Sequence, residues 1–196
     1  MRTFSTMEIT KVLQKENLAL FSLDDFKKIF KIAKRNTLYK KIQRLEEKKI
    51  IKRLAKGKYL FLFQKPHDFL MANFLYQPSY ISLESALSLY GIISGMSYQI
   101  TSLTPKKTKT IVIDVKEYVY SQIKSSLFWG YEKKQEFLIA DKEKAFLDYL
   151  YFAFKGLRQK DLSEFDLSSL DKKRIKNYFN KIKDKNFKKF YQQMVK

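Results

Sequence analysis

Residues 35–61, RNTLYKKIQRLEEKKIIKRLAKGKYLF, hold the side chains whose types and spacing point most directly to chemistry. The stretch contains ten Lys or Arg and two Glu, and leucines and isoleucines recur through it at regular intervals. Basic side chains donate hydrogen bonds to phosphates and to guanine, and an Asn amide can pair with adenine. The apolar spacing indicates a segment that folds on a core and turns its charge outward. Such a pattern is typical of a nucleic-acid-binding surface.

The apolar residues of this stretch predict a helix with one buried stripe. On a wheel of about 100° per residue, Ile42 and Leu45 fall within about 40° of Leu38. Lys40 then lies on the opposite face of the helix, and Arg44 lies on one flank. A helix in the major groove brings such side chains to the base edges, so Lys40 and Arg44 are the predicted base contacts.

Further polar residues complete the predicted DNA-binding surface. Thr37 and Lys41 are expected nearer to the phosphates, and Asn36 is suited either to a base or to capping the helix. Lys56 and Lys58 flank a predicted tight turn, from which they would reach the adjacent backbone or a minor groove. The candidate residues are Arg35, Asn36, Thr37, Lys40, Lys41, Arg44, Lys56 and Lys58.

The elements that must position this surface also leave signals in the sequence. Ser5 with Glu8, and Ser22 with Asp25, have the spacing of capping boxes and predict two helix starts before the basic helix. After the basic helix, two short apolar strands are predicted on either side of the turn. Three helices and a two-stranded hairpin predict a winged helix-turn-helix domain over residues 1–64.

The charge of the chain is unevenly distributed. The formal net charge of +20 divides into +11 for residues 1–63, +2 for residues 64–155 and +7 for residues 156–196. A basic head and a basic tail around a nearly neutral middle indicate an organised field rather than a uniform bias. The alternative interpretation of the basic helix is a solvated surface on a winged fold that binds protein.

Composition restricts the class of protein. The 196 residues suffice for one large or two small domains, and the apolar fraction of 45% argues against disorder. Cysteine is absent, the N-terminus lacks the apolar core of a signal peptide, and no run of about 18 apolar residues occurs. We therefore expect a soluble cytoplasmic protein with no membrane partner. His67 is the single histidine, so no metal site and no cofactor are expected.

Residues 65–196 predict a second domain of mixed α/β structure, so that the whole chain belongs to the α+β class. Several strands are expected between two short helices and a longer helix that begins after Asp141. The tail, residues 158–196, predicts basic amphipathic helices. These helices could close the core of the domain, contact DNA, dock a protein partner or lie on a membrane surface.

Asp141, Glu143 and Asp148 form the nearest approach to a carboxylate cluster. Catalysis would require them to converge on a pocket with perturbed pKa values. We instead expect Asp141 to cap the helix, Glu143 to complement its N-terminus and Asp148 to face water. A Gly-rich phosphate loop, a nucleophile elbow and a Cys–His pair are all missing, so the chain is not expected to be an enzyme.

Three segments resemble a known family. YISLESALSLYGII, LTPKKTKTI and FLIADKEKAFLDYLYF follow the predicted winged helix in the order seen in the AbiEi-type antitoxins of abortive-infection, type IV toxin–antitoxin systems. The resemblance spans roughly residues 5–155. Lys142 departs from the Pro that this family pattern has after the capping Asp.

The resemblance implies a DNA-binding autorepressor that recognises inverted repeats near the promoter of its own two-gene operon. It also implies an antitoxin that counteracts a nucleotidyltransferase-like toxin through the C-terminal domain, without requiring a stable complex. Two alternatives are a stand-alone winged-helix regulator of transcription without a toxin partner and a basic protein-interaction module.

Overall fold

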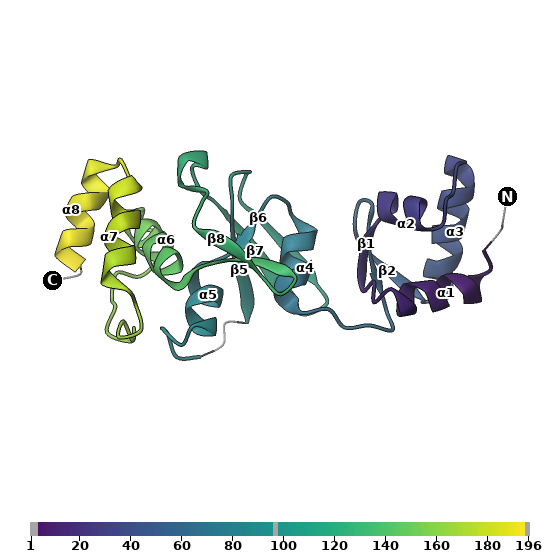
Figure 1. The fold of residues 1–196 in the computed structure, drawn as a ribbon, viewed down its shortest axis with the longest axis horizontal. Helices are drawn as coiled ribbons and strands as arrows, with labels where there is room; N and C mark the ends of the chain where they lie inside the picture. Colours follow the sequence, from purple (N-terminus) through teal and green to yellow (C-terminus); the bar gives the residue numbers. More distant parts are fainter. Residues whose placement is uncertain (1–3, 96–97, 195–196) are drawn as a thin grey trace. The chain divides into compact units, whose positions relative to one another are not determined.

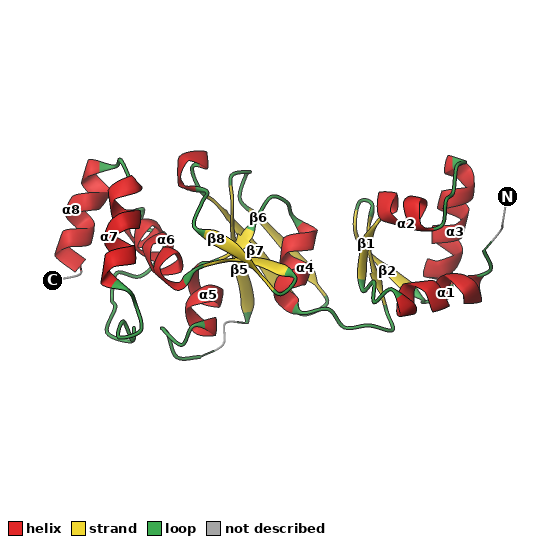
Figure 2. Cartoon of the chain, viewed as in Figure 1, coloured by secondary structure: helices red, strands yellow, loops and turns green. Residues whose placement is uncertain are grey.

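The computed structural model describes residues 4–95 and 98–194, and the chain divides into two compact units, Met1–Leu75 and Tyr76–Lys196 (Figure 1). Both units combine helices with a β-sheet, which confirms the α+β class (Figure 2). The division falls after Leu75, later than the boundary expected after residue 64. Among the described residues, no helix has both the length and the apolar character needed to cross a bilayer.

The first unit combines helices with a small sheet whose first strand lies between the first two helices, and both of these helices begin at the predicted capping residues. Ser5 accepts from the Glu8 amide, Ser22 accepts from the Asp25 amide, and both reciprocal bonds of the capping boxes are present. The three strands form an antiparallel sheet in the order β1-β3-β2. The elements are α1 (Thr6–Lys15), β1 (Leu20–Ser22), α2 (Leu23–Ile29), α3 (Arg35–Glu47), β2 (Ile51–Ala55), β3 (Lys58–Phe61) and α4 (Asp68–Leu75).

The core of the first unit is aromatic where the helices meet the sheet. Phe21 and Phe26 are fully buried, and their ring centres lie 5.7 Å apart. Phe21 of β1 also stacks on Tyr59, its partner on β3, so its contact with Phe26 joins α2 to the sheet. From α3, the predicted stripe of Leu38, Ile42 and Leu45 enters the same core. The orientation of α3 is therefore set by burial of apolar surface.

Lys58 joins the start of β3 to the end of α4. Its ammonium donates hydrogen bonds to the Phe74 and Leu75 carbonyls, at 2.5 and 3.0 Å, and lies 5.3 Å from the centre of the Phe74 ring. The last carbonyls of a helix have no partner within the helix, and a cation there also complements the helix dipole. The start of β3 thereby holds the end of α4.

The second unit is built on a six-stranded mixed sheet in the order β6-β7-β5-β4-β9-β8. Helix α6 packs against α5, α7, α8 and β9. The elements are β4 (Tyr80–Ile81), α5 (Leu83–Leu89), β5 (Gln99–Thr104), β6 (Lys109–Ile113), β7 (Lys116–Gln122), η1 (Ser125–Leu127), β8 (Tyr131–Lys134), β9 (Phe137–Ala140), α6 (Lys142–Phe154), α7 (Lys172–Lys181) and α8 (Lys185–Met194).

The apolar faces of the two tail helices turn inward. Phe187 of α8 is fully buried, and its ring centre lies 5.5 Å from that of Tyr151 on α6. Ile175 and Ile182 at α7 are also buried. These three apolar side chains of the tail therefore belong to the core of its own unit.

A buried ion pair lies in the N-terminal half of α6. Lys144 and Asp148 are one turn apart, and each side chain is 3% exposed. Tyr80 and Ser82 donate hydrogen bonds to Asp148 Oδ2 at 3.0 and 2.9 Å. Lys144 Nζ donates to Tyr80 Oη at 3.1 Å and lies 4.9 Å from the centre of the Trp129 ring. Burial raises the pKa of Asp148, while Lys144 is the strongest influence that lowers it.

The prediction that Asp148 faces water is therefore wrong. Its charge suggested an exposed position, but α6 is covered around its whole circumference and the carboxylate is matched by buried donors. The Ser82 side chain is likewise engaged by a distant residue. Ser82 occupies the N-cap position of α5, but its hydroxyl donates to Asp148 rather than capping the helix. A long-range partner overrides the local role in both cases.

Asp141 and Glu143 attach α7 to the start of α6. Asp141 caps α6 as predicted, and its second oxygen accepts from Tyr178 at 2.6 Å and from Arg174 at 3.1 Å. Glu143, 1% exposed, accepts from the Asp171 amide at 3.0 Å, and one of its oxygens is 3.8 Å from Arg174 Nε. Glu143 thus supports the start of α7, a role that the sequence pattern did not predict.

Loss of the Asp148 charge is expected to destabilise the second unit. Asp148→Asn leaves Lys144 buried without a counter-charge, so the free energy of unfolding should fall by about 3–5 kcal/mol. Adding Lys144→Met should recover part of this loss, because it removes the unpaired cation. Urea unfolding can be followed by the fluorescence of Trp129, which is the single tryptophan of the chain.

The matched control is Glu136→Gln, which removes a carboxylate from an exposed position. It should change the same transition by less than about 0.5 kcal/mol. If Asp148→Asn behaved like this control, the buried pair would not be needed to hold α6 in place.

Candidate nucleic-acid interface

The outward face of α3 is fixed by what the helix buries. Leu38, Ile42 and Leu45 are 3%, 2% and 1% exposed, so the opposite side of the helix faces solvent. Lys40 and Arg44, the two predicted base contacts, are both exposed. The structure therefore presents them on the same helix, one turn apart.

The first turn of α3 is open to an anion. Lys34 occupies the N-cap position, no side chain caps the helix, and no acidic residue lies in the first turn. Asn36 is therefore not the cap, and its exposed amide belongs to the first turn together with Thr37. Uncapped amides at a helix N-terminus attract phosphate. This arrangement leaves Asn36 available for the base-reading alternative.

Arg35 is oriented by an aromatic neighbour on the next turn. Its guanidinium donates to Tyr39 Oη at 3.4 and 3.2 Å and lies 5.5 Å from the centre of that ring. The hydrogen bond with Tyr39 raises the pKa of Arg35 further above its usual range. Tyr39 is 43% exposed and forms, with Arg35, the flank of α3 opposite to Arg44.

Lys41 and Arg44 line a hollow on the other flank. The hollow has a volume of about 330 Å³ and is bounded on its far side by the start of α1. Lys41 is half-buried and donates to the Phe4 carbonyl at 2.6 Å. Its ammonium thus also joins the end of the chain segment before α1 to α3, and its expected contact with a phosphate stays a prediction.

The two lysines of the turn have different positions. Lys56 is exposed, and Gly57 follows it with a φ of +71°, a left-handed conformation that glycine adopts without strain. Lys58 was expected to reach DNA beside Lys56, but its ammonium lies instead on the terminal carbonyls of α4. The cause is the unsatisfied end of that helix, which the local sequence around the turn does not reveal.

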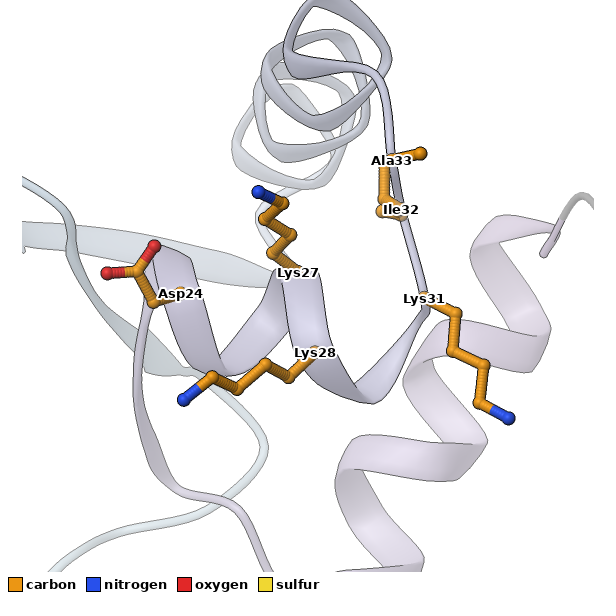
Figure 3. A pocket seen from close by; sticks show the side chains of 6 residues that line it. All are labelled: Asp24, Lys27, Lys28, Lys31, Ile32 and Ala33. Carbon is orange, nitrogen blue, oxygen red and sulfur yellow. The ribbon is translucent and has the colours of Figure 1, made fainter.

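A second basic cluster lies on α2 and the turn before α3. Lys27, Lys28 and Lys31 line a pocket of about 420 Å³, together with Asp24 and the apolar start of the turn. Figure 3 shows that the three side chains extend in different directions and do not converge on one point. Such a spread suits several phosphates along a backbone better than one small anion.

Acidic groups are confined to the distal part of α3. Glu47 accepts a hydrogen bond from Gln43 at 2.9 Å, so each side chain is partly engaged by the other. Glu46 is half-buried and, after burial itself, is the strongest influence that raises the pKa of Tyr59. The carboxylates therefore do not approach the basic first half of the helix.

The described residues contain no group of three or more His, Asp or Glu side chains placed to hold a metal ion. The residues that surround α3 provide hydrogen-bond donors and positive charge, and the arrangement is suited to binding a polyanion.

Four exposed residues of this surface were missed by the sequence predictions. Lys27, Lys28 and Lys31 follow a capped helix start at helical spacing. This pattern was a sufficient signal to add them to the predicted DNA-binding residues. The role of Tyr39 depends on its contact with Arg35, which is four residues earlier, the distance at which helical side chains meet.

The sequence was also compared with known proteins. No protein-family model matches the chain, and a search of the curated proteins finds no match.

Proposed function

We propose that the first unit is a winged helix-turn-helix that binds duplex DNA, with α3 as its recognition helix. The observation that carries this proposal is the outward face of α3. Asn36, Lys40 and Arg44 are exposed together on a helix whose first turn has neither a side-chain cap nor an acidic residue. These are side-chain types that pair with adenine and guanine in the major groove.

The surrounding lysines have a different role in this proposal. Lys27, Lys28 and Lys31 beside α3, and Lys56 at the turn, bind phosphates on either side of the groove. Phosphate contacts supply affinity and strong salt dependence, while the contacts of α3 choose the sequence. Lys58 acts within the protein and holds α4.

We further propose that the chain is an autorepressor and an antitoxin, on the basis of its resemblance to the AbiEi-type antitoxins. Its second unit would counteract a nucleotidyltransferase-like toxin.

Co-expression of the chain with such a toxin from a neighbouring gene should restore growth. If growth is not restored, the stand-alone regulator of transcription is the better assignment. A protein-interaction module is favoured only if duplex DNA is bound without sequence preference.

Arg44→Ala is expected to lower discrimination at one base pair by about 1–3 kcal/mol, because a single bidentate contact is lost. The measurement is a binding titration on duplexes of the upstream DNA in which each base pair is replaced in turn. Lys40→Ala should affect a different base pair.

The control for this scan is Lys133→Ala, which removes one exposed positive charge from β8 in the second unit. It should leave the ranking of the duplexes unchanged. If neither α3 variant lost specificity at any base pair, α3 would not be the recognition helix.

Lys56→Ala and Lys58→Ala should separate DNA binding from structure. Lys56→Ala should weaken binding to every duplex alike and reduce the slope of log affinity against log salt by about one. Lys58→Ala should instead speed hydrogen exchange of the α4 amides, because two terminal carbonyls lose their donor. Hydrogen exchange would be measured by mass spectrometry in both variants. Faster exchange of the α4 amides in Lys56→Ala alone would show that Lys56, and not Lys58, holds α4.

A further inference from the structure

An apolar groove lies in the second unit where α7 and α8 meet α6. Its volume is about 500 Å³. Figure 1 shows the three helices together at the C-terminal end of the chain, and both α7 and α8 contact α6. The groove plays no part in the proposed DNA interface, which lies in the first unit.

The lining changes from apolar to basic between the floor and the rim. Phe146, Leu170 and Ile175 form a floor that is fully or almost fully buried. Half-buried Phe179 and Tyr191 form the wall where α7 meets α8, with ring centres 4.6 Å apart. Because these side chains are only partly covered, the groove has room for a further apolar group.

The rim carries positive charge on one side. Lys172 and Lys176 are exposed and lie one turn apart on α7, so both face the groove from the same side. The lining residues include no Asp or Glu. An occupant with an apolar body and negative charge at its edge is therefore complementary to the groove.

We propose that this groove docks an acidic amphipathic helix of a partner protein. The apolar side chains of that helix would contact Ile175, Phe179 and Tyr191, while its carboxylates would pair with Lys172 and Lys176. A protein segment fits better than nucleic acid because the floor is formed by Leu170, Ile175 and the buried ring of Phe146. A duplex presents its charged phosphates outward, and their burial against this apolar floor would cost desolvation energy.

The probe is a synthetic helix of Glu and Leu with apolar residues at i, i+3, i+4 and i+7, labelled for fluorescence anisotropy. A second peptide of the same composition, shuffled so that no apolar face forms, controls for charge. The full chain should bind the amphipathic peptide about tenfold more tightly than the shuffled one, since only the first can fill the floor.

Two charge-reversed variants locate the binding. Lys172→Glu/Lys176→Glu alters the rim, and Lys173→Glu/Lys183→Glu makes the same charge change at exposed positions outside the lining. The rim variant should weaken binding of the amphipathic peptide by about tenfold or more, and the control variant by less than about threefold.

Equal losses in the two variants would overturn the proposal, because they would show an attraction to net charge alone. Equal binding of the two peptides, or no binding of either, would overturn it as well. A rim variant that loses duplex DNA but keeps the amphipathic peptide would assign the groove to nucleic acid. The peptide measurements do not depend on the DNA contacts of α3, so this proposal and the proposed function fail independently.

Discussion

Burial of one apolar stripe of α3 is the constraint on which the proposed DNA-binding surface depends. Leu38, Ile42 and Leu45 occupy the core of the first unit and fix the rotation of the helix about its axis. Once that rotation is fixed, the positions of the exposed polar residues follow from helical geometry. Replacing one of these three residues by a smaller one would therefore lower stability and would also make the orientation of Lys40 less well defined.

The second unit uses buried polar contacts for a similar purpose. Lys144 and Asp148 pair inside α6, and Asp141 and Glu143 hold the start of α7 against it. Gly130 allows the chain to approach this pair, because a Cβ there would lie 2.8 Å from Lys144 Cγ. Polar groups in such surroundings stabilise one arrangement only when all of them are matched. The groove proposed for a partner helix rests on the resulting position of α7.

Local signals in the sequence predicted the first unit well. The two capping boxes, the apolar stripe of α3 and the turn at Gly57 involve residues close together in the chain, and all three are found. Contacts between distant segments could not be predicted in this way. Lys58 binds the end of α4, and Asp148 binds residues more than sixty positions earlier. Helix periodicity carries no information on such partners, so both charged side chains were expected to face outward.

The most direct test of the DNA-binding proposal is fluorescence anisotropy with the DNA upstream of the chain's own gene. Scrambled duplex of equal length would be measured beside it, at two salt concentrations. The proposal predicts a preference of about 10³-fold or more for the upstream DNA that survives physiological salt. Equal and steeply salt-dependent binding to both duplexes would contradict it, because the net charge of +20 would then act only as an attraction to polyanions.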